Sequence, residues 1–100
     1  MVAAELDSEL DLSLILHALS DPHRRTIVRE LAAAAEPVPC GAIMLEVGKS
    51  TRTHHFRVLR EAGLISQRRE GTRKLTSLRK AEVDAEFPGL LDAVLVPVPV

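Results

Sequence analysis

The sequence contains no tryptophan, no tyrosine and only two phenylalanines, so aromatic residues make up 2% of its 100 residues. The hydrophobic core must therefore be built from leucine, valine, isoleucine and alanine, which belong to the 46% of residues that are hydrophobic. A chain of this length predicts one small domain. Such domains often gain stability by dimerising, because the monomer buries a small share of its surface.

Further absences exclude whole classes of protein. Cys40 is the only cysteine, which excludes an intramolecular disulfide and fits a reducing cytosol. No stretch approaches the roughly 18 apolar residues that a membrane-spanning helix needs, and the N-terminus begins acidic, unlike a signal peptide. Because the sequence also lacks a glycine-rich phosphate loop and a nucleophile elbow, we expect a cytoplasmic protein that is not an enzyme and has no membrane partner.

The net charge of −1 conceals an uneven distribution of charge along the chain. Residues 49–80 carry ten Lys/Arg and two acidic residues, a net charge of +8, whereas the rest carries three basic and twelve acidic residues, a net charge of −9. Cations gathered in one continuous third of a domain are typical of a surface that binds a polyanion. A solvated basic surface would have the same composition.

The stretch KSTRTHHFRVLREAGL, residues 49–64, predicts one helix with a marked start and end. We expect Ser50 to be its N-cap and Gly63 to end it in a left-handed conformation. One side of this helix comprises Arg52, His55, Phe56, Leu59 and Ala62 and is apolar except at the first two. The other side is polar and mostly cationic near the N-terminus, which suits a DNA major groove, although an ordinary amphipathic surface helix has the same pattern.

Three shorter helices are predicted before this stretch. They span residues 8–19, 22–35 and 40–47. Asp7 or Ser8 can cap the first helix, and Ser20 or Asp21 can cap the second, in which Pro22 occupies the first helical position without loss of a hydrogen bond. A glycine-containing turn joins the third helix to the stretch at 49–64, and helix, tight turn, helix is the helix-turn-helix pattern.

A β-hairpin is predicted after Gly63. Residues 64–70 and 73–78 form two β-compatible runs around a turn at Gly71-Thr72, and basic residues flank its tip. A basic hairpin that follows a recognition helix can touch phosphates or a minor groove. Residues 79–96 predict a short helical turn and a last helix. We therefore predict a mainly α winged helix-turn-helix domain over residues 8–95, in the order α-α-α-α-β-β-α, with a flexible segment at 1–7 and an extended tail at 96–100.

The assembled pattern resembles the ArsR/SmtB family of bacterial winged-helix repressors. The resemblance rests on ALSDPHRRTIVREL (18–31), KSTRTHHFRVLREAGLI (49–65) and SQRREGTRKLTSLR (66–79). It implies a homodimer that pairs through its first and last helices. It also implies that the dimer is a repressor, which binds an inverted-repeat operator on double-stranded DNA and is released or tuned by an unidentified effector.

The resemblance, together with the basic residues of the hairpin, indicates which residues are expected to contact DNA. From the helix these are Lys49, Ser50, Thr51, Arg52, Thr53, His54 and Arg57, and from the hairpin Arg68, Arg69, Arg73 and Lys74. His55 matches a second histidine of the family, and we expect it to be semi-buried. Arg52 departs from the family pattern, which has an apolar residue there. Either its stem packs while its head reaches the DNA, or the helix is rolled.

No cofactor is predicted, although many members of that family sense metals. Cys40 is the one thiol at the position of a known cysteine site, and a single thiolate does not make a tetrahedral site. The last helix has no histidine. A divalent transition metal held by His17, His23 or Cys40 is the remaining alternative. We otherwise expect Cys40 to act as a small apolar residue.

Two functions are consistent with these patterns. The first is a dimeric, sequence-specific regulator of transcription. The second is a winged-helix interaction module whose acidic first and last segments bind a partner sensor protein that controls release from DNA.

Overall fold

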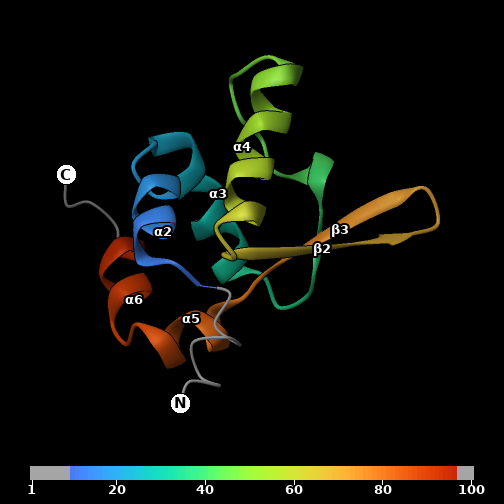
Figure 1. The fold of residues 1–100 in the computed structure, drawn as a ribbon. Coiled ribbons are helices and arrows are strands. Elements are labelled where there is room, and N and C mark those ends of the chain that lie inside the picture. Colours follow the sequence, from blue (N-terminus) through green and yellow to red (C-terminus); the bar gives the residue numbers. More distant parts are fainter. Residues whose placement is uncertain (1–9, 97–100) are drawn as a thin grey trace.

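The computed structural model describes residues 10–96, which form helices around a small antiparallel sheet (Figure 1). The elements are α2 (Leu12–Ala18), α3 (Pro22–Ala33), β1 (Val38–Pro39), the 3-10 helix η1 (Cys40–Ala42), α4 (Lys49–Glu61), β2 (Ile65–Glu70), β3 (Arg73–Leu78), α5 (Lys80–Glu86) and α6 (Leu90–Leu95). The predicted flexible segment 1–7 and the tail beyond residue 96 lie outside the described residues. No helix in residues 10–96 is long and apolar enough to cross a membrane.

Within residues 10–96, aspartate side chains begin the two helices that precede the sheet, α2 and α3. Asp11 accepts backbone N–H groups at 2.8 and 3.3 Å and starts α2, so this helix begins later than the predicted residue 8. Asp21 accepts the N–H groups of His23 and Arg24 at 2.8 and 3.2 Å and starts α3, with Pro22 in the first turn as predicted. These bonds satisfy backbone donors that have no partner inside a helix.

The predicted helix at 40–47 is wrong. Val38 and Pro39 instead pair with Thr76 and Leu75 of β3, and only the single turn of η1 follows. Gly41 lowers helix propensity by about 1 kcal/mol, and a helix of this length has little stability of its own. The chain is therefore extended at Ile43, whose side chain is buried. The observed order accordingly differs from the predicted α-α-α-α-β-β-α, and two short helices, α5 and α6, end the described chain.

The predicted hairpin is confirmed and forms the longer part of a sheet with strand order β1-β3-β2. Glu70 pairs with Arg73 at its tip, and Gly71 in the two-residue loop has a φ of 64°, which favours glycine. In Figure 1 the hairpin extends away from the helices, as the wing of a winged helix does.

One hydrophobic core joins the helices and the base of the sheet. Its fully buried members include Ile15, Ile27, Leu59, Leu64 and Leu91, which come from α2, α3, α4, the turn after α4, and α6. These residues are aliphatic, as the shortage of aromatics required. Leu59 holds the inner side of α4 against the core, so the opposite side of α4 faces solvent.

Candidate nucleic-acid interface

Helix α4 ends at a well-defined turn and begins without a side-chain cap. Gly63, at φ 84°, donates its N–H to Arg60 O at 3.0 Å, and Leu64 donates to Leu59 O at 3.1 Å. This pair of bonds is a Schellman motif, and the predicted stop at Gly63 is confirmed. The prediction of Ser50 as N-cap is wrong, because the helix begins at Lys49 after Gly48.

The start of α4 therefore presents backbone N–H groups that no capping side chain occupies. Lys49, Ser50, Thr53 and Arg57 surround a shallow hollow of about 540 Å³ beside this end of the helix. All four side chains are exposed. Free N–H groups and the positive end of the helix dipole favour an anion there. This end of α4 can accordingly receive a phosphate group.

The predicted contact residues are almost all on the surface. Every one of the eleven except Arg52 is exposed, namely Lys49, Ser50, Thr51, Thr53, His54, Arg57, Arg68, Arg69, Arg73 and Lys74. In Figure 1 the first turns of α4 and the tip of the hairpin both extend beyond the remaining helices. One polyanion can therefore touch both elements. Contact with DNA itself stays a prediction for each residue.

The wing carries more cations than its single carboxylate can offset. Glu70 lies 3.6 Å from Arg68 and 3.9 Å from Arg73, measured between guanidinium nitrogens and carboxylate oxygens. All three side chains are more than half exposed, so these pairs contribute little to stability. Arg69 and Lys74 form no ion pair with a residue in the range 10–96. These two cations are available to an incoming phosphate.

The sequence left two alternatives for Arg52, a packed stem with its head at the DNA or a rolled helix, and the structure matches neither in full. Its guanidinium donates a hydrogen bond to the Cys40 carbonyl and lies over the Phe56 ring, 5.4 Å from the ring centroid. The stem packs, as one alternative expected, but the head turns back toward the η1 segment. Arg52 thus holds the start of α4 against η1, a role that the sequence did not reveal.

A buried polar cluster supports α4 from below, and it too was missed by sequence reasoning. Arg24 is 6% exposed and His55 is 5% exposed. The guanidinium of Arg24 donates to Ala18 O at 2.7 Å and to His17 O at 3.2 Å, and its third nitrogen lies 3.2 Å from His55 Nδ1. Arg24 thereby ties the end of α2 and the start of α3 to α4. His55 faces inward as predicted, but it is buried and not semi-buried.

The pKa values of this cluster depart from their ordinary values. Burial lowers the pKa of His55 below 6.5, and the nearby Arg24 lowers it further, against the opposing effect of Asp21. Burial alone would raise the pKa of Asp21, but the backbone N–H groups of Arg24 and His23 hold it below 3.8. His55 is therefore neutral at pH 7, with Nδ1 as the acceptor for Arg24 and Nε2 3.9 Å from the Asp21 carboxylate.

Stability is expected to fall on mild acidification. A histidine with a lowered folded-state pKa is protonated first in the unfolded chain, so the free energy of unfolding decreases as the pH drops below about 6.5 toward the pKa of folded His55. The slope for one proton is at most about 1.4 kcal/mol per pH unit. Asp21 adds a further loss below about pH 3.8. Urea denaturation at a series of pH values measures both.

His55→Gln should flatten the slope just below pH 6.5, because glutamine keeps an acceptor for Arg24 but does not titrate. His17→Gln, which removes an exposed histidine from α2, is the matched control. Equal slopes in the His55→Gln variant and the unmodified protein would show that another group titrates.

The candidate metal ligands His17, His23 and Cys40 are not grouped into a metal site in the described part of the chain. Within residues 10–96, no three or more His, Cys, Asp or Glu side chains are grouped so as to hold a metal ion. The His23 ring lies 5.8 Å from the His55 ring between centroids, and Cys40 Sγ lies 3.1 Å from Thr76 Oγ1. His17 is exposed on α2. Metal sensing through these residues is untested.

Comparison with known proteins identifies a protein family and a relative that share these elements. A family described as a helix-turn-helix domain matches residues 19–68, from the end of α2 into β2. The chain is also 35% identical over 82 residues to an uncharacterized HTH-type transcriptional regulator, YceK, of Bacillus subtilis (strain 168). That similarity covers 80% of this chain and 82% of the relative. Both comparisons include α4.

Proposed function

Because the chain belongs to the helix-turn-helix domain family and is a DNA-binding regulator, we propose that it is a homodimeric repressor of the ArsR/SmtB type that binds an inverted-repeat operator. An effector would release or tune this binding. The observation that carries the proposal is the exposed start of α4 next to a cationic wing. A helix in the major groove and a hairpin on the adjacent backbone read bases and phosphates together.

The roles of the side chains differ within this proposal. Thr53 is exposed on α4 and can meet a base edge or a phosphate of the recognised sequence. Arg69 lies on β2 near the hairpin tip and offers only a charge to the backbone. Base contacts discriminate between sequences, whereas phosphate contacts bind all DNA and make affinity depend on salt.

The homodimer is proposed from the apolar surface of α2. Leu12, Leu14 and Leu16 are 44%, 50% and 49% exposed in the single chain. Leu12 and Leu16 are four residues apart and share one side of the helix. Such leucines favour an apolar partner, and a second copy would set two α4 helices about one duplex turn, roughly 34 Å, apart. A partner sensor protein on the same surface is the alternative.

Operator binding tests the proposal. We expect Thr53→Ala to weaken binding to the DNA upstream of the protein's own gene about ten-fold, which corresponds to about 1.4 kcal/mol of binding free energy. Binding to random DNA should be unchanged. Arg69→Ala should weaken both DNAs alike and reduce the slope of log affinity against log salt by about one unit. Fluorescence anisotropy titrations at several salt concentrations measure all four combinations.

An equal loss on both DNAs for Thr53→Ala would contradict the role of α4 in recognition. Thr72→Ala, in the hairpin loop, is a matched removal of an exposed hydroxyl outside α4 and should preserve the preference for the upstream DNA. Repeating the titration with Zn²⁺, Ni²⁺, Co²⁺, Cu²⁺ and a chelator tests whether a metal is the effector.

A further inference from the structure

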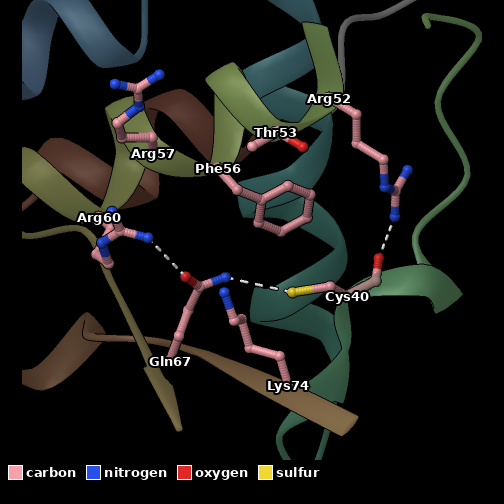
Figure 2. Close-up of a pocket in the computed structure, with 8 residues that line it drawn as sticks. All are labelled: Cys40, Arg52, Thr53, Phe56, Arg57, Arg60, Gln67 and Lys74. Carbon is pink, nitrogen blue, oxygen red and sulfur yellow. Dashed lines mark hydrogen bonds between the residues drawn. The ribbon is translucent and has the colours of Figure 1, made fainter. Parts of the chain in front are cut away.

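A cleft lies between α4 and the base of the wing, beside the hollow at the start of α4. Figure 2 shows that α4 forms one wall, the strands β2 and β3 the opposite side, and the η1 segment a third. Its volume is about 410 Å³, within the range of sites that hold small organic molecules. The lining residues are Cys40, Arg52, Thr53, Phe56, Arg57, Arg60, Gln67 and Lys74.

The lining of this cleft is cationic and contains no carboxylate. Four of its eight residues are Arg or Lys, and none is Asp or Glu. Arg60 donates to the side-chain oxygen of Gln67 at 3.0 Å, and Arg52 donates to the Cys40 carbonyl. Both acceptors are neutral, so these hydrogen bonds orient the guanidinium groups without cancelling their charge. An anion in the cleft would supply the missing negative charge.

The interior combines one directed cation with an apolar surface. In Figure 2 the Lys74 side chain extends from β3 into the cleft, and the Phe56 ring, most of which is buried, lines it from α4. Gln67 reaches across to donate to Cys40 Sγ at 3.2 Å and to Thr76 Oγ1 at 3.2 Å, which fixes its position between Arg60 and Cys40. A ligand with both an anionic end and an apolar body can therefore satisfy Lys74 and Phe56 together.

We propose that this cleft is the effector site and that it takes a small organic anion, a phosphate or carboxylate carried on an aromatic or other apolar body. The anionic group is held by Lys74 with Arg60 or Arg52, and the apolar body lies on Phe56 and Cys40. Release of DNA by this ligand rests on the proposed function, but binding of the ligand to the cleft does not.

Binding at this site would release DNA by direct competition. Thr53 and Arg57 line both this cleft and the hollow at the start of α4, and Lys74 belongs to the cationic wing. A phosphate of the DNA and the anion of the ligand cannot use Lys74 at the same time. The effector would thus act at the DNA surface itself, without a change in the dimer contacts.

Phenyl phosphate is a suitable probe of this site. We expect isothermal titration calorimetry to show one phenyl phosphate bound per chain. Methyl phosphate, which has no aromatic body, and benzyl alcohol, which has no charge, should each bind at least ten-fold more weakly. Lys74→Gln should raise the Kd of phenyl phosphate by about ten-fold or more, the loss for one charge-assisted hydrogen bond.

Arg73→Gln is the matched control for Lys74→Gln. Arg73 precedes Lys74 on β3 and therefore points to the other face of the strand, and it does not line the cleft. Both substitutions remove one wing cation and should weaken DNA binding, but only Lys74→Gln should weaken binding of phenyl phosphate. Equal weakening by both would assign the probe to diffuse surface charge and overturn the proposal.

Cys40 provides a second readout that needs no substitution. It is the only cysteine of the chain and it lines the cleft. Phenyl phosphate should slow its alkylation by iodoacetamide at least five-fold at saturation, while methyl phosphate at the same concentration should not. An unchanged alkylation rate at saturating phenyl phosphate would place the ligand elsewhere.

The two proposals fail in distinguishable ways. Sequence-selective DNA binding without binding of phenyl phosphate overturns the effector site and leaves the regulator intact. Binding of phenyl phosphate at Cys40 and Lys74 without DNA binding supports the site and overturns the proposed function. Competition is supported when phenyl phosphate displaces DNA from the unmodified protein, and it is overturned when both ligands bind together.

Discussion

Arg24→Met should lower the free energy of unfolding by about 2–4 kcal/mol, because it leaves buried hydrogen-bond acceptors without a donor, at a cost of about 1–3 kcal/mol each. The Arg24 guanidinium, which is almost wholly buried, donates to the carbonyls of His17 and Ala18 and to His55. Methionine fills a similar volume but leaves these acceptors without a donor. A domain of this size has about 5–15 kcal/mol of stability, so the loss removes a large share.

Arg25→Met is the matched control, because Arg25 follows Arg24 in α3 and is only half-buried. Its guanidinium donates to Leu19 O at 2.8 Å, and we expect the loss of that bond to reduce stability by about 1 kcal/mol. Urea denaturation at one fixed protein concentration compares the variants, since the stability of a dimer depends on concentration. Similar losses for both variants would contradict the assigned role of Arg24.

Local signals explain why several elements could be predicted from the sequence. The Asp21 side chain caps the first turn of α3. Gly63 ends α4 and Gly71 forms the hairpin turn, both through a positive φ that favours glycine. Such residues specify their conformation within a few positions of the chain. The helix-turn-helix assignment agrees with the matched family, although the helix at 40–47, on which the sequence argument based it, is a single 3-10 turn at Cys40–Ala42.

Long-range partners explain what the sequence did not reveal. The 40–47 stretch has helical spacing, but the two residues before it, Val38 and Pro39, pair with β3, and only one 3-10 turn follows them. Arg24 is expected from the sequence to be a surface cation on α3, and only the folded chain brings the carbonyls at the end of α2 and the His55 ring around it. Arg52 similarly needs the Cys40 carbonyl from a distant segment. His55 is 31 positions from Arg24 and Cys40 is 12 positions from Arg52, whereas Ala18 and His17 lie only six and seven positions before Arg24 but on a different helix.

Part of the candidate site could be predicted from the sequence and part could not. Its exposed cations on α4 and the wing could be named from charge and spacing, because exposure requires no specific partner. The cleft could not, since Cys40, Phe56, Gln67 and Lys74 come from four separate segments. A cavity is a property of how elements pack, and a single sequence shows the elements only one at a time.

Leu16→Glu should reduce affinity for a complete inverted-repeat operator by about 100-fold or more. Leu16 is 49% exposed on α2, so the charge does not enter the core of the single chain, but it would lie in the proposed dimer contact. A dimer binds two half-sites at once, which raises its affinity for the operator by a factor on the order of 10²–10⁴, and a monomer lacks this increase. Sedimentation equilibrium measures the dimer, and anisotropy on full and half operators measures DNA binding.

The half operator separates this effect from unfolding, because a folded monomer should still bind one half-site with the affinity of the unmodified chain. Met44→Glu is the control for the oligomeric state: Met44 is 83% exposed in the loop before α4, away from α2, and should leave the dimer intact. A dimer that survives Leu16→Glu would move the two-fold contact to another surface. In that case the exposed leucines of α2 would be better explained by a partner protein, and operator symmetry would have to arise from a different pairing of the α4 helices.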